Sequence, residues 1–247
     1  MTCAACRVGT SGWVYRHWRG TFYPEELPQK QWFRYYAERF ATVELNKTFY
    51  SLPSEKTVQD WQHLAPAGFQ YAVKYSRFGT HNKKLKDPDS HLDRFMTPVR
   101  HLAGNLGPVL VQLPPRWAPN TERLREFLDA LGTQVDRIAL EIRDPRWFRD
   151  DVLEVCRQRN VCLVIHDMIE DHPQDRTADF SYFRFHGEHY RGSYDDDALR
   201  QIADQAAAIS DDGNEVYIYF NNDEACHAAH NALHLQEMLA ERACPRS

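Results

Sequence analysis

Two glutamates, Glu44 and Glu141, lie near the ends of short apolar segments that have the composition of buried strands. Two carboxylic acids that face each other can act as general acid and general base, as they do in glycosidases. The alternative is a structural ion network in which both glutamates balance cations. The residue types alone leave both interpretations open.

Three cations occupy similar positions: Lys74, Arg143 and Arg184 each end or follow an apolar segment. Arginine binds phosphate and carboxylate with two parallel hydrogen bonds, and buried cations need a counter-ion. We therefore expect an anionic ligand that is a small molecule or is nucleotide-like. Hydrogen-bonding side chains at equivalent positions complete the predicted binding set: Asn46, Gln112, Tyr219, Asn221 and Asn222.

His166, which precedes Asp167, and His186 are the histidines at segment ends. Each could transfer protons together with Lys74, Glu44 or Glu141. The same histidines and carboxylates could bind a divalent metal. Several neighbouring positions, however, are cations or amides, which seldom coordinate a metal directly. We assign no cofactor and keep a divalent metal as the alternative.

Aromatic residues are concentrated in the segments that follow the predicted strands. Trp13, Tyr50 and Trp147 are the ones we expect to contact a ligand, because aromatic faces beside polar groups stack on sugars and bases. The alternative for the whole group is a hydrophobic plug, which we prefer for Phe22 and Phe49.

Short β-branched or aromatic segments alternate with longer amphipathic ones, which predicts strands and helices in turn. The predicted strands cover residues 7–10, 42–45, 71–75, 109–112, 137–141, 162–166, 181–185 and 215–220. The predicted helices cover residues 30–40, 55–63, 92–102, 121–131, 149–158, 196–209 and 225–240. Ser54, Asn120 and Asp195 immediately precede three of these helices and are good N-caps.

Strict alternation of eight strands with helices predicts parallel strands with right-handed crossovers. Eight such units in 247 residues match one (β/α)8 TIM-type barrel with helices outside. An open doubly wound sheet is the alternative, but Gly9 to Trp13 form a poor dinucleotide-binding turn. We therefore expect one barrel domain over residues 7–241, a flexible tail over 1–6 and a C-terminal tail over 242–247.

Side chains two residues apart share one face of a strand. Glu44 with Asn46, and Glu141 with Arg143, follow this rule at the carboxyl ends of their strands. Alternation often marks a half-exposed strand. Because the polar residues are concentrated at the carboxyl ends, where barrel enzymes have their active sites, we prefer a functional site there.

Composition excludes several classes of protein. Thirty Lys and Arg against 35 Asp and Glu give a net charge of −5, so no overall basic field points to nucleic acid or membrane. The N-terminus has no apolar signal core and no segment is long enough to cross a bilayer, which predicts a cytoplasmic protein without membrane contact. Cys3 and Cys6 form a lone C-x-x-C motif, for which we predict no metal or redox role.

Several motifs follow one another in order: GTSGW, VELNKTFYSLP, VKYSRFGTHNKKL, LGPVLVQLPP, ALEIRDPRWF, YFRFHG and YIYFNND. This series resembles the YecE-like family of bacterial and archaeal barrels, which carry a domain of unknown function. The resemblance runs from Arg7 to about Leu239 and implies a TIM-type barrel, but no catalytic residues. The chain departs from the family at Asp144, where a histidine is common, and at Ala225 and Cys226, where glycines are usual.

The sequence therefore predicts an acid–base enzyme of the hydrolase, lyase or isomerase type with an anionic, phosphate- or sugar-containing substrate. A nucleic-acid binding or processing protein, related by fold to endonuclease IV-like barrels, is the first alternative, and salt-dependent binding would identify it. A non-catalytic ligand sensor with the same site is the second.

Overall fold

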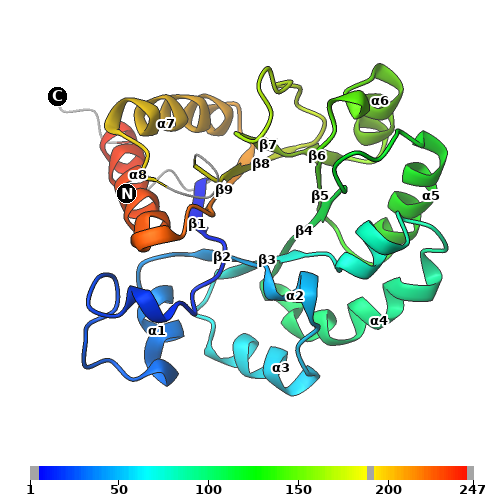
Figure 1. Ribbon diagram of the computed structural model, residues 1–247. Helices are drawn as coiled ribbons and strands as arrows, with labels where there is room; N and C mark the ends of the chain where they lie inside the picture. The colour runs from blue at the N-terminus through cyan, green and yellow to red at the C-terminus, as the bar shows by residue number, and fades with distance from the viewer. Residues whose placement is uncertain (1–5, 188–191, 244–247) are drawn as a thin grey trace. The chain divides into compact units, whose positions relative to one another are not determined.

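The computed structural model describes residues 6–187 and 192–243, which alternate between strands and helices as predicted (Figure 1). Cys3 and most of the two predicted tails lie outside the described residues. The first strand begins at Cys6, where residue 7 was predicted, and the last helix continues to Ala243, where residue 240 was predicted. Both terminal elements therefore extend further than the sequence pattern indicated.

The strands form two parallel sheets, of four and five strands. Their bounds are β1 Cys6–Thr10, β2 Thr42–Leu45, β3 Gln70–Lys74, β4 Leu106–Gln112, β5 Ile138–Glu141, β6 Val161–Leu163, β7 Ile165–His166, β8 Phe180–Phe185 and β9 Glu215–Phe220. The sixth predicted strand is divided at Val164 into β6 and β7. The structure is thus an α/β fold with two parallel sheets, whereas the sequence predicted one closed sheet.

The chain divides into two compact units. The first comprises the chain up to Val43 and from Phe180 onward, and in it β9 pairs in parallel with β1 on one side and β8 on the other. The second runs from Glu44 to Asp179, and in it β3, β4, β5 and β6 pair in parallel in this order. Because β2 contains the division point, each unit takes part of that strand.

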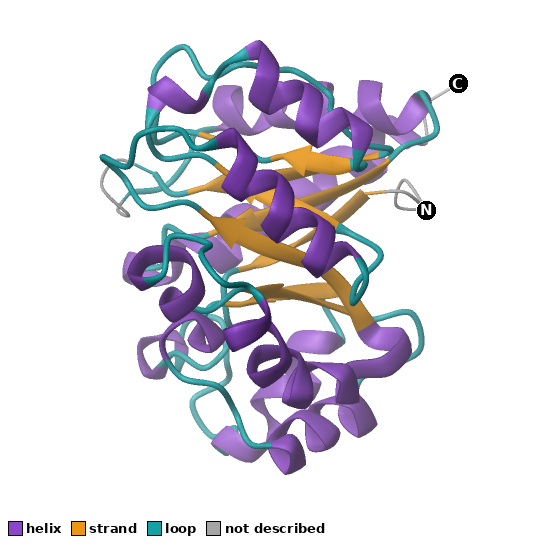
Figure 2. Ribbon diagram, turned by 90° about the vertical axis from the view of Figure 1, so that its right-hand side faces the viewer, coloured by secondary structure: helices purple, strands orange, loops and turns teal. Residues whose placement is uncertain are grey.

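The helices, which Figure 2 draws in purple, include all the predicted ones, with shifted ends. They are α1 Trp32–Ala37, α2 Lys47–Tyr50, α3 Glu55–Leu64, α4 Asp89–Val99, α5 Thr121–Gly132, α6 Asp150–Gln158, α7 Asp196–Asp211 and α8 His227–Ala243. The short α2 was not predicted. The helix predicted to Leu102 ends at Val99, and irregular turns follow in which Ala103 has a φ of 48°. None of the described helices combines the length and the apolar character that crossing a membrane requires.

The predicted N-caps are confirmed. Ser54, Asn120 and Asp195 accept hydrogen bonds from the backbone N–H groups three residues later, at 3.2, 2.9 and 2.8 Å. Each bond satisfies one of the N–H groups that the first turn of a helix leaves without a partner in the helix.

Close contact between two backbone segments explains why β1 has a glycine at position 9. A Cβ atom at this position would lie 2.4 Å from the carbonyl oxygen of Thr42. The Tyr36 hydroxyl donates to the same oxygen at 3.0 Å and accepts from the Thr10 N–H at 3.0 Å. Within the first unit, the first glycine of the GTSGW motif therefore serves close packing rather than phosphate binding.

The strands that carry the predicted site are buried along their whole length. Every residue of β2, β5 and β8 is buried, and Glu44, Glu141 and Arg184 have no exposed surface. The interpretation of their polar residues as the solvent face of half-exposed strands is therefore wrong.

Candidate functional site

Three neighbouring strands of the second unit end beside one another and place polar side chains together. Lys74 ends β3, Gln112 ends β4 and Glu141 ends β5. The register pairs Lys74 with Leu110 and Gln112 with Glu141, so the three side chains share one face of the parallel sheet, with Lys74 two residues below the level of the other two. We call Lys74, His81, Gln112, Glu141 and Arg143 the strand-end cluster.

Glu141 is held by two donors within this cluster. Arg143 Nε and Gln112 Nε2 both donate to Glu141 Oε1, the latter at 2.8 Å. The Arg143 side chain is 12% exposed and that of Glu141 is fully buried. This contact is the ion pair that the structural interpretation of Glu141 predicts, and it holds the Arg143 guanidinium in place.

Lys74 is only 8% exposed, and its Nζ lies 4.5 Å from the ring centroid of Phe49. A cation over an aromatic face is attracted by the ring's quadrupole. The Thr48 hydroxyl donates to the Lys74 carbonyl at 2.7 Å and thereby fixes α2 against the end of β3. The NKTFY motif thus supplies the aromatic face on which Lys74 lies.

His81 belongs to the same cluster but was not among the predicted site residues. It lies in a π-helical turn, Phe78–Asn82, and its ring contacts Phe49 edge-on at 5.1 Å. Burial lowers the pKa of His81, and the charges of Lys74, Arg77 and Arg143 lower it further, while Glu141 opposes them. The ring is therefore neutral near pH 7 in a field that is mainly positive.

The hydrogen bonds around His81 define its tautomer. Thr80 Oγ1 donates its single proton to the Ser76 carbonyl at 3.0 Å, so it accepts from His81 Nδ1–H at 2.9 Å. The neutral ring then carries its lone pair on Nε2. No hydrogen bond of this Nε2 occurs within the described parts of the chain. His81 can therefore accept a proton from a bound molecule.

His166 has a different environment from the one we predicted. Its Nε2–H donates to the Ile142 carbonyl at 2.8 Å, and its Nδ1 accepts from the Met168 N–H at 3.2 Å. Burial lowers the pKa of His166 to about 4. With both nitrogens bound to the backbone, the ring serves the structure, and the prediction that His166 is catalytic is not supported by this geometry. His172, which the sequence analysis did not single out, packs edge-on against the His166 ring, with 4.6 Å between the ring centroids.

Glu44 is buried at the end of β2, and Asn46 follows it at the start of α2. Since β3 and β4 separate β2 from β5 in the sheet, Glu44 and Glu141 do not come from neighbouring strands. Neighbouring strands lie about 4.8 Å apart, so a direct carboxylate pair does not follow from the sheet geometry.

The first unit holds six of the predicted residues: Trp13, Arg184, His186, Tyr219, Asn221 and Asn222. Arg184, His186 and Tyr219 are fully buried, and Arg184 lies opposite Tyr219 in the β8–β9 register. The Tyr219 hydroxyl bonds the Thr42 hydroxyl at 2.6 Å, which connects β9 to the start of β2. These contacts give Tyr219 a structural role.

The two asparagines after β9 differ from each other. Asn221 is half-buried, and its backbone N–H donates to the Phe185 carbonyl at 2.7 Å. Asn222 is buried and donates to the Asn231 side chain and the Gly192 carbonyl, both at 2.9 Å. Asn222 therefore links its loop to α8, and a role in ligand binding is not supported.

Two of the three predicted aromatic contacts are not supported by the structure. Trp147 has no exposed surface and donates its indole N–H to the Trp117 carbonyl at 2.6 Å. Trp13 is 7% exposed and packs edge-on against Phe33 at 5.3 Å. Both rings face the interior, because aromatic surface contributes most to the stability of the fold when it is buried. Tyr50, by contrast, is 76% exposed.

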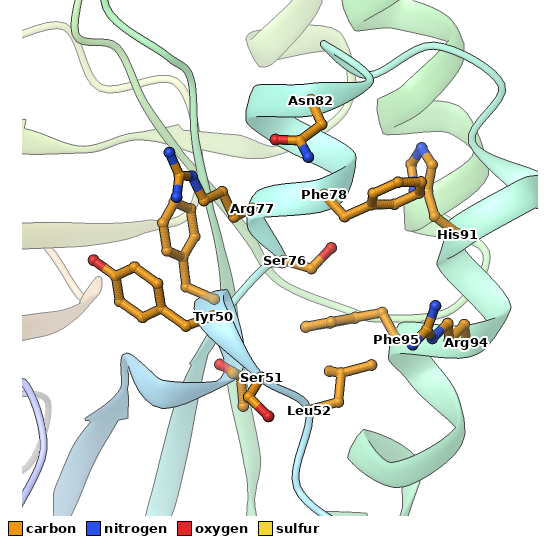
Figure 3. Close-up of a pocket in the computed structure, with 12 residues that line it drawn as sticks. Tyr50, Ser51, Leu52, Ser76, Arg77, Phe78, Asn82, His91, Arg94 and Phe95 are labelled. Atoms are coloured by element: carbon orange, nitrogen blue, oxygen red, sulfur yellow. The ribbon is translucent and has the colours of Figure 1, made fainter.

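Tyr50 lines a cavity of about 660 Å³ beside the strand-end cluster (Figure 3). The cavity lies between α2, the π-helical turn and α4, all in the second unit. Phe49 contributes to its wall as well as to the surroundings of Lys74 and His81. This cavity was not predicted, because its walls come from segments that are distant in the sequence.

The described part of the chain contains no group of three or more His, Cys, Asp or Glu residues that could hold a metal ion. Lys74 and Arg143 would also repel a cation at the strand-end cluster. These residues suit an anion better than a metal.

The family model described as "Protein of unknown function DUF72" matches residues 7–246. UPF0759 protein YecE of Escherichia coli K12 is 31% identical over 114 residues, which cover 46% of this chain and 42% of YecE. The aligned region is thus less than half of YecE's length. UPF0759 protein YunF of Bacillus subtilis is 24% identical over 94% of both chains.

Two solved structures have the same fold. A DUF72 family protein of Thermotoga maritima has a TM-score of 0.81 at 29% identity, with 96% of this chain and 99% of that chain covered. A DUF72 family protein of Enterococcus faecalis has a TM-score of 0.77 at 20% identity, with 95% of each chain covered, which supports the fold alone. Because the family model matches nearly the whole sequence, the chain belongs to the DUF72 family.

Proposed function

We propose that this protein is an acid–base enzyme that acts on an anionic, phosphate- or sugar-containing small molecule at the strand-end cluster. Lys74 and Arg143 bind the anionic group, Glu141 positions Arg143, and His81 accepts a proton from the substrate. The reaction type is that of an isomerase, lyase or hydrolase.

The hydrogen-bonding arrangement of Ser76, Thr80 and His81, from which the tautomer of His81 is assigned, is the observation that carries this proposal. A general base needs a lone pair within reach of the proton it removes. The Thr80 hydroxyl holds the His81 proton on Nδ1 and leaves Nε2 as the basic atom. Lys74 and Arg143 act on the same ring through their charge, so a substrate anion bound to them would lie near this base.

A titration of His81 by NMR tests the binding step. Inorganic phosphate at the cluster should raise the pKa of His81, because an anion offsets the cations that lower it. The effect should be weaker in Arg143→Gln, and the exposed His63 provides a control signal that should not move. An unchanged His81 titration at saturating phosphate would contradict the proposed site.

A screen for turnover tests the catalytic step. Phosphate esters and sugar phosphates are incubated with wild type and with His81→Gln, and products are followed by phosphorus NMR. General-base catalysis contributes roughly 100- to 10,000-fold, so turnover should fall by about that factor in the variant. Binding of these compounds without turnover of any would favour the ligand sensor over the enzyme.

We also keep the closed (β/α)8 barrel as a proposal. The alternation of strands with helices and the burial of β2, β5 and β8 on both faces support it. A crystal structure with one uninterrupted ring of parallel strands is the expected result. An open edge in either sheet would contradict it.

A further inference from the structure

The cavity beside the strand-end cluster has the composition of a ligand site that the proposed reaction does not use. Its volume of about 660 Å³ is within the range of about 300–1,000 Å³ that is usual for small-molecule pockets. In Figure 3, Tyr50 and Arg77 lie on one side, and Phe78, His91, Arg94 and Phe95 on the other. Phe49 lines the cavity and also contacts Lys74 and His81, neither of which belongs to the lining.

The cavity exposes aromatic rings. Tyr50 is 76% exposed and Phe78 is 48% exposed, and both are among the large apolar side chains that the described chain leaves at the surface. The floor is apolar, because Phe95 is buried and Leu52 is half-buried. Exposed rings above an apolar floor offer stacking surfaces to a flat molecule.

The cavity also contains two cations. Arg77 lies in the segment after β3 and Arg94 lies on α4, so they approach from different elements. Neither arginine forms an ion pair with any carboxylate in residues 6–187 and 192–243. Guanidinium groups bind phosphate by paired hydrogen bonds, and neither arginine side chain donates a hydrogen bond within these described residues. Ser51, Ser76 and Asn82 add polar groups to the lining.

His91 also lines the cavity, and its ring belongs to the scaffold. Its Nε2–H donates to the Lys86 carbonyl at 3.1 Å, and its Nδ1 accepts from the Tyr75 hydroxyl. Both nitrogens are engaged, so the ring supplies shape without a charge or a free base. The cavity therefore has the features of a binding site and lacks those of a catalytic one.

We propose that this cavity binds a small organic phosphate that carries a flat ring, with a nucleoside monophosphate as the representative ligand. The ring stacks on Tyr50 or Phe78, and the phosphate binds Arg77 or Arg94. The site is distinct from the strand-end cluster and does not depend on the reaction proposed there.

Calorimetric titration with four compounds tests the proposal: adenosine 5′-monophosphate, adenosine, ribose 5-phosphate and inorganic phosphate. The monophosphate should bind at least tenfold more tightly than each of the other three, because it alone combines ring and phosphate. Equal affinity for ribose 5-phosphate would show that the ring contributes nothing and would overturn the proposal. Absence of binding by the monophosphate would overturn it as well.

Variants locate the site. Arg94→Gln and Tyr50→Ala should each weaken monophosphate binding about tenfold, whereas the controls Arg34→Gln and Leu64→Ala change exposed residues on other elements and should have no effect. Arg143→Gln should leave this affinity unchanged, although it weakens phosphate binding at the strand-end cluster. Loss of monophosphate binding in Arg143→Gln, with Arg94→Gln unaffected, would assign the ligand to the cluster and refute the cavity site.

Discussion

The Nε group of Arg143 donates a hydrogen bond to Oε1 of Glu141, two residues earlier, at the end of β5. Their sequence spacing places both side chains on one face of the strand, and the burial of Glu141 makes the pair costly to break. The orientation of the predicted anion-binding group therefore depends on a carboxylate that the sequence presented as a catalytic acid.

Glu141→Gln should lower the free energy of unfolding by about 3–5 kcal/mol, because it leaves the largely buried Arg143 without its counter-charge. Urea denaturation measures this effect. Glu38→Gln provides the control, since Glu38 pairs with Arg34 at the surface and its loss should cost less than about 1 kcal/mol. A stability equal to wild type would instead restore Glu141 as a catalytic acid.

Lys74→Met should raise the pKa of His81, because it removes one of the positive charges that lower it. Methionine retains the apolar length of the side chain and its contact with Phe49. NMR titration of the His81 ring measures the shift, with the exposed Lys56→Met as the control. A pKa that stays constant would show that Lys74 and His81 do not share one site.

His166 should make the fold less stable in acid. Its folded pKa of about 4 lies below the unfolded value of 6.5, so the unfolded chain binds more protons between these two pH values. Stability is therefore fully present above pH 6.5 and decreases as the pH falls toward 4. The shift corresponds to about 3 kcal/mol. Denaturation of wild type and His166→Gln over this range should show a shallower pH dependence in the variant, and identical slopes would contradict the assignment.

Gly9→Ala should destabilise the protein by about 1–3 kcal/mol, because its methyl group meets the Thr42 carbonyl and the backbone must move. Gly132→Ala is the matched control. That position ends α5 and has open space around it, so alanine should be neutral or stabilising by less than about 1 kcal/mol. Thermal denaturation compares the two, and equal melting temperatures would contradict the packing argument.

Three features could be predicted from the sequence alone: the alternation of strands and helices, the helix N-caps and the polar residues at strand ends. These features are local: hydrophobic periodicity and capping depend on residues a few positions apart. The prediction that Lys74, Gln112 and Glu141 end their strands is confirmed for this reason.

The roles of individual residues within that pattern depend on long-range packing. Trp147 and His166 are of residue types that often contact ligands. In this structure, however, each ring is buried and donates a hydrogen bond to a backbone carbonyl, so it stabilises the fold. His81 reaches the cluster only because a π-helical turn follows β3, which no spacing rule indicates. The cavity near Tyr50 is formed by segments brought together by packing, and long-range contacts of this kind are not encoded in local periodicity.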